Sequence, residues 1–490
     1  MSIAAERLHS VNSKPVNSDG RFVLYWMVAA RRPRFNFALQ HAVERAQQLK
    51  KPLVVLEPLR LRYRWASDRF HRFLIEGMRA NAAAFEGRAV TYYPFVESDV
   101  ESKPGDDSLL AAFAETACEV ISDDAPYFFY PAMVRAVAKR LPVRLSLVDS
   151  NTVIPMRLAE RTFTVAHSYR RHMHRNVIQW LDQMPQADPL EGVSLPKLRQ
   201  LPPSVTEHWE RADLKRLLSP GGLHDLPIDH SVAVVETLEG GAASAQRRWT
   251  GFLEQGLGRY DQDRNQPDCD GSSQMSPFLH FGHISAHQLV RDVLASESWR
   301  PEKLGDAIGK NQGFWGTSLA VEGFLDQVLT WRELGFNMAV RHPDRFDNLR
   351  SLPDWAKKSI QETARDRRPY LYGLSELEEA GTHDPVWNAA QRQLRQTGRM
   401  HNYLRMLWGK LIYQWTESAE QSFEFMEHLN NKYALDGRDP NSYSGILWVL
   451  GRYDRAWGPK RPVFGSLRYM TSDSARRKLK LERYLRRFEG

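Results

Sequence analysis

The chain has 490 residues, which is enough for two or three domains with hydrophobic cores of their own. Its formal net charge of +8 favours a polyanionic partner. Its two cysteines, Cys118 and Cys269, lie far apart without a partnered Cys or His spacing, which argues against a disulfide framework and a zinc site. We therefore expect no metal and a reducing, cytoplasmic compartment. No run approaches the roughly 18 apolar residues of a membrane span, so no membrane partner is expected.

The first twenty residues lack the apolar core of a signal peptide, and we expect residues 1–20 to form a flexible tail. Residues 21–155 alternate short apolar runs with helical patterns, and a helix is expected over 37–49. Strands are expected at 22–26, 52–56, 90–93, 125–130 and 145–149. This alternation predicts a Rossmann-like, doubly wound α/β domain, although no glycine-rich phosphate motif accompanies it.

Proline, glycine and charged residues are frequent between about 185 and 239, which indicates an interdomain connector over 156–239. Beyond Gly240, amphipathic helical patterns dominate and strand signals are few. We therefore expect an all-helical domain over 240–490, and an α/β plus all-α architecture for the whole chain.

Basic residues run through 452–487 and alternate with Tyr453, Trp457, Phe464 and Tyr469. Arginines contact phosphates and aromatic faces stack on unpaired bases, so this composition favours a distorted nucleic acid as partner. The alternative is a solvated basic helix over 476–487.

Hydroxyl residues gather in the stretch 272–282 (SSQMSPFLHFG), where Ser276 is placed to cap a helix that begins at Pro277. A helix N-terminus preceded by serines favours an anion such as phosphate. An ordinary capped helix is the simpler explanation of the same residues.

The stretch 272–282 is similar to the flavin pyrophosphate loop of the photolyase/cryptochrome superfamily, and further motifs of that superfamily follow it. They are 382–394 (THDPVWNAAQRQL), 398–406 (GRMHNYLRM), 435–441 (LDGRDPN) and 461–470 (RPVFGSLRYM). The last two are characteristic of class II photolyases, which the chain resembles strongly from 272 to 470 and more loosely before. The resemblance implies an antenna domain over 21–155 and a helical FAD-binding and DNA-binding catalytic domain over 240–490.

By this resemblance, a U-shaped FAD has its phosphates and ribityl chain against Tyr260, Ser272, Ser273, Met275 and Ser276. Its isoalloxazine ring meets Asn402, Arg405 and the loop at Asp436. Arg405 and Asp436 match an ion pair beside the flavin, although such a pair in a helical core can also serve structure alone.

Asn430 matches the asparagine that faces flavin N5, with Asn441 as a second candidate, and a neutral amide there does not oppose the anionic, reduced flavin. An asparagine that closes a helix is the simpler interpretation of Asn430.

Trp387, Trp408 and Trp415 match the tryptophans that carry electrons from the surface to the flavin. Trp408 and Trp415 are two helical turns apart, so we expect them on one face with rings that can approach. Aromatic residues at this spacing are ordinary core packing in most proteins.

Trp331 and Trp448 match the tryptophans that stack on a pyrimidine dimer flipped out of the duplex, at a cost of only a few kcal/mol for a damaged base. The alternative is that these tryptophans line the pocket of FAD itself. Arg468 matches the arginine that fills the gap left in the DNA, Met406 is expected near the same pocket, and Arg461 is expected to contact DNA.

One position departs from the family. Four residues before Trp331, where the family has a glutamate that hydrogen-bonds the dimer, this chain has Gln327. Glutamine donates a hydrogen bond but supplies no proton. The adjacent Asp326 is a poor substitute, because one residue along an α-helix turns about 100°.

The resemblance predicts a light-driven carbon-carbon lyase in which excited, reduced FAD splits cyclobutane pyrimidine dimers in DNA. We also expect a deazaflavin or folate antenna in the N-terminal domain. The protein is expected to be a cytoplasmic monomer that associates with the nucleoid when it binds DNA. One rival is a cryptochrome-like blue-light receptor, which Gln327 favours. A second rival is (6-4) photoproduct repair, which would need histidines such as His280, His283, His287 and His401.

Overall fold

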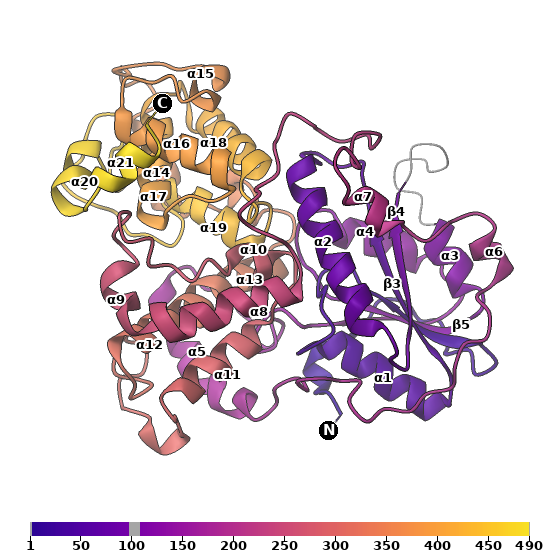
Figure 1. Cartoon of the computed structure of the whole chain (residues 1–490). Coiled ribbons are helices and arrows are strands. Elements are labelled where there is room, and N and C mark those ends of the chain that lie inside the picture. Colours follow the sequence, from indigo (N-terminus) through magenta and orange to yellow (C-terminus); the bar gives the residue numbers. More distant parts are fainter. Residues whose placement is uncertain (1, 98–107, 490) are drawn as a thin grey trace. The chain divides into compact units, whose positions relative to one another are not determined.

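The computed structural model describes residues 2–97 and 108–489. The chain divides into two compact units, each of which is discontinuous in sequence. The first unit comprises 1–158, 177–249 and 275–292, and the second comprises 159–176, 250–274 and 293–490. Figure 1 shows an N-terminal part that holds strands and a C-terminal part built of helices.

The first unit is built on a six-stranded sheet of order β1-β6-β5-β2-β3-β4, parallel except for the edge pair of β1 with β6. Its strands are β1 (Leu8–Ser10), β2 (Phe22–Trp26), β3 (Leu53–Leu59), β4 (Thr91–Val96), β5 (Ala117–Asp123) and β6 (Leu145–Val148). Its helices include α1 (Phe37–Leu49), α2 (Asp68–Phe85), α3 (Ser108–Ala114) and α4 (Tyr130–Ala138). Shorter ones follow as α6 (Pro203–Thr206), α7 (Leu214–Leu217), α8 (Ala242–Gly251) and α10 (Ser276–His280).

Helices cover both faces of this sheet. On β2 the odd-numbered Val23 and Tyr25 pack in one core with α1, while Phe22 faces the ring of Phe113 on α3, 6.1 Å between centroids. Alternate residues of a strand point to opposite faces, so α1 and α3 lie on opposite sides. The doubly wound α/β fold is therefore confirmed, as is the helix over 37–49.

One expected strand was wrong. The segment 125–130 is a turn that leads into α4, and the strand lies earlier, as β5. Polar residues interrupt the hydrophobic pattern of β5, so the pattern does not reveal the strand. These residues are nevertheless buried, and their polar atoms are hydrogen-bonded or ion-paired. Glu119 binds Arg45 at 2.5 Å, and Asp123 Oδ2 accepts the backbone N–H groups of residues 28–30 at 2.7–2.9 Å.

The expectation of a loose N-terminal tail is also corrected. Residues 8–10 form β1, and the preceding Arg7 is 2% exposed. Its guanidinium donates to the carbonyl oxygens of Thr152 and Val153, at 2.9 and 2.6 Å, and the guanidinium plane lies over the ring of Phe37. A buried arginine that binds backbone carbonyl oxygens distant in sequence gives no hydrophobic signal in the sequence.

The boundaries of the two units also differ from those of the contiguous domains expected from the sequence. Helix α5 (Ala166–Leu181), inside the expected connector, divides between the two units, and so does α11 (Ala286–Ser296). The rest of the connector, from 182 to 239, belongs to the first unit. There the backbone N–H of Ala212 donates to Pro94 on β4, so the segment packs on the sheet edge.

The second unit is helical, as expected beyond Gly240. Its helices are α9 (Tyr260–Asp263), α12 (Leu319–Leu325), α13 (Arg332–Arg341), α14 (Asp354–Glu362), α15 (Leu374–Glu378), α16 (Pro385–Thr397), α17 (Asn402–Gln414), α18 (Ala419–Tyr433), α19 (Pro440–Val449), α20 (Ser472–Lys478) and α21 (Glu482–Arg487). Two π-helical segments interrupt this pattern, η2 (Phe252–Gly256) and η5 (Asp326–Trp331). Such segments often mark functional sites.

Candidate functional site

The three predicted electron-transfer tryptophans lie in contact in the second unit. Trp387, on α16, stacks on Trp408 with ring centroids 6.5 Å apart and planes 6° from parallel, and it meets Trp415 edge-on at 5.7 Å. Trp387 Nε1 donates to the carbonyl oxygen of Trp408, and Trp408 Nε1 donates to Gln391. Trp387 therefore bridges the other two, whereas the sequence suggested a direct approach of Trp408 to Trp415.

The aromatic contacts continue past Trp415 toward the surface. Tyr372 lies 5.4 Å from Trp415, and its hydroxyl is 2.7 Å from His383 Nδ1. The His383 ring in turn stacks on Tyr370 at 3.9 Å, and Tyr370 is 50% exposed. A pocket of about 420 Å³ opens beside His383 and Trp415. The rings of Trp408, Trp387, Trp415, Tyr372, His383 and Tyr370 therefore form an aromatic row that reaches solvent.

The predicted ion pair forms. Arg405, on α17, places Nη2 3.2 Å from Asp436 Oδ1, and both side chains are largely buried. Asn402 begins the same helix and is exposed. Asn430 is 3% exposed inside α18, and its amide donates to Ser442 at 2.7 Å. Asn441 is exposed, so Asn430 is the buried amide of the two candidates.

The predicted phosphate loop is held firmly in the second unit up to Gln274. Arg399 grips Asp270 with both terminal nitrogens, and Gln274 Nε2 donates to the same carboxylate. This fixes the short segment that carries Ser272 and Ser273, of which Ser272 is exposed.

Tyr260, the other predicted contact of this segment, is 7% exposed, and its ring packs 5.5 Å from Phe324. Burial raises the pKa of the Tyr260 hydroxyl above its ordinary value. The phenol therefore stays neutral and available as a hydrogen-bond donor.

The expected cap at Ser276 is wrong. Helix α10 begins at Ser276 itself, its cap position is Met275, and no side chain caps it. Both residues belong to the first unit, Met275 buried and Ser276 exposed. The helix spans only 276–280, which is too short to support the anion-binding argument made from the sequence.

The predicted lesion residues form one cluster in the second unit. Trp331 and Trp448 lie 5.8 Å apart with planes tilted by 41°. The Arg468 guanidinium sits 5.5 Å from the Trp448 ring and 4.4 Å from that of Trp457. Asp454 holds this arrangement, because its carboxylate accepts from Arg468 Nε and from Trp457 Nε1, each at 3.1 Å. We call these five residues the tryptophan wall.

Two further residues, Met406 and Arg461, were predicted near the lesion pocket and at the DNA. Met406 is 8% exposed on α17, which keeps its thioether largely out of contact with solvent. Arg461 is exposed and lies over the ring of Tyr469 at 4.9 Å, which suits a contact with a backbone phosphate.

Gln327 lies in the π-helical segment η5 and is partly exposed. The neighbouring Asp326 is committed elsewhere, because its two oxygens bind Arg170 Nε and Nη2 at 2.6 and 3.0 Å. A bidentate pair of this kind holds a carboxylate firmly in place. Asp326 therefore does not replace the glutamate that position 327 lacks.

Two of the four histidines considered for a second repair chemistry, His283 and His401, are neutral and hydrogen-bonded. Burial lowers the pKa of His283 to about 3, and its Nδ1 accepts the backbone N–H of Gly241. Burial lowers the pKa of His401 to about 4, with Nε2 3.0 Å from the carbonyl oxygen of Arg264. Neither supplies a proton near neutral pH.

Within residues 2–97 and 108–489, no group of acidic, cysteine or histidine side chains is arranged to hold a metal ion. In the same residues, the helices are too short or too polar to cross a membrane. Cys118 and Cys269 are both free thiols.

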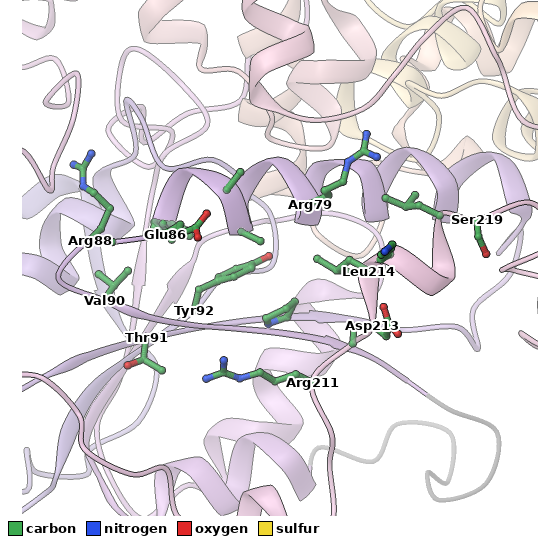
Figure 2. A pocket seen from close by; sticks show the side chains of 18 residues that line it. Arg79, Glu86, Arg88, Val90, Thr91, Tyr92, Arg211, Asp213, Leu214 and Ser219 are labelled. Carbon is green, nitrogen blue, oxygen red and sulfur yellow. The ribbon is translucent and has the colours of Figure 1, made fainter.

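The first unit carries a groove of about 1060 Å³ along its edge strand. Figure 2 shows Arg79 on α2, Thr91 and Tyr92 on β4 and Leu214 on α7 around it. Arg79 is paired with Glu239 at 2.9 Å. Doubly wound sheets bind ligands at the carboxyl ends of their strands, whereas this groove borders β4 from its first residue, Thr91, to Pro94. We assign it no ligand.

Comparison with known proteins identifies the family. No family model matches the chain. The deoxyribodipyrimidine photo-lyase of Methanothermobacter thermautotrophicus is 32% identical over 494 residues, which covers 100% of this chain and 99% of that protein. The chain belongs to the deoxyribodipyrimidine photo-lyase family. A photo-lyase of Oryza sativa subsp. japonica is 30% identical over 98% of this chain and 88% of its own length.

The fold of the photo-lyase family is also found among solved structures. A bacterial class III photolyase from Agrobacterium tumefaciens matches with a TM-score of 0.63 at 18% identity, over 98% of this chain and 88% of that one. At this identity the likeness supports the α/β plus helical fold alone.

Three residues of this photo-lyase family member were missed from the sequence. Tyr372 and His383 extend the tryptophan row, and Asp454 organises the tryptophan wall. His383 lies inside the 382–394 motif and Asp454 inside the basic, aromatic segment. The sequence shows both residues but does not show which side chains they contact. Tyr372 has no local signal, because its partners lie 11 and 43 positions away.

Proposed function

We propose that this protein repairs DNA by splitting cyclobutane pyrimidine dimers under near-ultraviolet or blue light, with a reduced FAD as cofactor. The observation that carries the proposal is the tryptophan wall, in a member of the photo-lyase family. Two aromatic planes tilted by 41° suit two pyrimidines whose rings are joined and bent out of a common plane. The Arg468 cation beside them suits the phosphates and the gap of an opened duplex.

The residues of the second unit fit a flavin. The Arg405–Asp436 pair presents a polarised donor, Asn430 offers a buried neutral amide, and the fixed segment at 272–273 offers hydroxyl donors for phosphate. Reduced FAD bound there would supply the light-excited electron that opens the dimer, and would take that electron back. The protein contributes orientation and electrostatics around this chemistry.

The aromatic row has a separate task, which is to return the flavin to its reduced state. Trp408, Trp387 and Trp415 are in ring contact, and Tyr372 and His383 join them to the exposed Tyr370. An indole gives up an electron far more readily than an aliphatic side chain, so a continuous row of rings forms a path between surface and core. This path serves a repair enzyme and a light receptor alike.

The rival function is a cryptochrome-like receptor, and Gln327 is the feature that favours it. A receptor has no need of the tryptophan wall, which an Asp454 carboxylate holds in place with two hydrogen bonds. Repair of (6-4) photoproducts is a weaker alternative, because His283 and His401 are neutral and hydrogen-bonded.

Replacing Gln327 by Glu is expected to raise the number of dimers repaired per absorbed photon, because a carboxyl group can donate a proton that an amide cannot. The measurement compares photoreduced wild type and variant on one dimer-containing oligonucleotide under limiting light. Asp326→Asn, which weakens the pair with Arg170 instead, serves as a control that should bring no gain. An unchanged or lower yield for Q327E would remove this explanation of position 327.

We further propose a cytoplasmic monomer that joins the nucleoid on damaged DNA. A second chromophore, a deazaflavin or a folate, is proposed for the first unit, outside the groove of Figure 2. Light-dependent loss of dimers from an oligonucleotide, absent in darkness, tests the proposed activity. A protein that binds flavin and photoreduces it but leaves dimers intact in light would favour the receptor.

A further inference from the structure

A buried amine that none of the steps above uses lies against the end of α19, which carries Trp448 of the tryptophan wall. Lys410, on α17, is 1% exposed, and its Nζ donates to the carbonyl oxygen of Val449 at 2.5 Å. Val449 is the last residue of α19 and directly follows Trp448. Among the described residues, Lys410 forms no ion pair. Burying an ammonium group without a paired carboxylate costs free energy, so the part of the fold that this amine binds is of interest.

The position of Lys410 connects it to the wall from two sides. The final carbonyls of a helix have no partner within the helix, and a cation there is favourable, so Lys410 fixes the end of α19 at Val449, the residue that follows Trp448. The charges that act on Lys410 are those of Asp454 and Arg468, which are themselves paired at 3.1 Å. The neighbouring Gly409 leaves room for this approach, because a Cβ there would lie 2.5 Å from Val449.

We propose that Lys410 is a positioning residue for lesion recognition, whose side-chain amine holds the end of α19, and with it Trp448 beside the Asp454–Arg468 pair, in the geometry that receives a flipped pyrimidine dimer. This inference rests on the proposed function, because it names the support of the same lesion site. Lys410 acts through Trp448 and Arg468 and has no contact of its own with DNA.

If Lys410 supports the lesion site, its loss should affect lesion binding and folding stability differently, whereas loss of an ordinary packing residue would lower both. Loss of the amine should disturb recognition of the dimer, which needs the wall, more than binding of undamaged DNA, which needs only exposed cations. It should also relieve the cost of burying a charge, which offsets the lost hydrogen bond to Val449. Selective loss of lesion binding with little loss of folding stability is therefore the signature.

The pH dependence of stability gives a second signature. Burial lowers the pKa of Lys410 from 10.5 to about 7, against the opposing effect of Asp454 and with that of Arg468. Between these values the unfolded chain binds a proton that the folded chain does not, so this residue makes stability rise with pH from about 7 to 10.5. Below pH 7 both states are protonated and the cost of the buried charge is complete. Wild type should therefore gain stability relative to Lys410→Met as pH rises through that window.

The experiment measures equilibrium binding of the flavin-loaded protein, in darkness, to a single-stranded oligonucleotide with one cyclobutane thymine dimer and to its undamaged twin. Lys410→Met should weaken dimer binding about tenfold, the effect of losing one hydrogen bond to a charged group. Binding of the undamaged strand and flavin content should stay at wild-type values. Lys410→Arg, which keeps a cation, should recover most of the dimer affinity. If the Met variant does not fold, Lys410→Gln is measured against the same criteria.

Three results would overturn the inference. The first is a Lys410→Met variant that binds the dimer as wild type does. The second is equal weakening on both strands together with lower unfolding stability, which would make Lys410 an ordinary packing residue. The third is a wild type that does not distinguish the two strands, which would remove the proposed function itself and this inference with it.

Discussion

Trp387→Phe is expected to slow photoreduction of the bound flavin roughly a hundredfold, which corresponds to about 2.7 kcal/mol of added barrier. The reason is the bridging position of Trp387, which contacts Trp408 on one side and Trp415 on the other. A phenyl ring fills most of the space but is much harder to oxidise than an indole. The rate is measured from the flavin absorbance under constant blue light with an external electron donor.

A matched control separates this effect from damage to the core. Trp315 is 2% exposed in the same unit and packs edge-on against Trp299 at 5.6 Å, outside the aromatic row. Trp315→Phe should leave photoreduction unchanged. Trp387→Phe enzyme reduced chemically beforehand should still repair dimers. Photoreduction of the Trp387 variant at the wild-type rate would contradict the assignment of the row.

Trp331→Ala is expected to weaken binding of a dimer-containing oligonucleotide roughly tenfold to a hundredfold, because a base stacked on an aromatic ring contributes about 1–3 kcal/mol. The same change at Trp448 should have a similar effect, since the two rings form one surface. Binding of undamaged DNA, which depends on phosphate contacts, should change little. Fluorescence anisotropy at fixed salt concentration provides the measurement.

The control for this prediction is a tryptophan elsewhere. Trp209, in the first unit, is partly exposed, and its backbone accepts from the Tyr93 hydroxyl and donates to the Val205 carbonyl oxygen. Trp209→Ala should bind the dimer as wild type does. If Trp331→Ala retains full lesion affinity while Trp209→Ala also does, the two rings belong to another site, such as the wall of the flavin pocket.

Much of the fold could be predicted because its signals are local. The apolar run of β2 and the periodic pattern of α1 gave correct bounds, since both bury continuous or regularly spaced hydrophobic residues. The strand β5 could not be found that way, because Glu119 and Asp123 are satisfied by groups distant in sequence. Arg7 anchors the N-terminal segment for the same reason.

Some contacts of the candidate site could be predicted from the sequence, and others could not. The family resemblance placed Trp331 with Trp448 and Arg405 with Asp436, pairs that the structure brings into contact. It could not show that Trp387 bridges the other tryptophans, because helices α16 and α17 must pack before that contact exists. Nor could it distinguish Lys410 from an exposed lysine, since burial is a property of the folded chain.

The most direct test of the central claim uses two oligonucleotides, one with a cyclobutane thymine dimer and one with a (6-4) photoproduct. Each is illuminated with blue light in the presence of photoreduced protein, and the products are separated by chromatography. We expect the cyclobutane dimer to be converted to two thymines in light and to persist in darkness, with the (6-4) product unchanged. A cyclobutane dimer that survives illumination with fully photoreduced, DNA-bound protein would contradict the account.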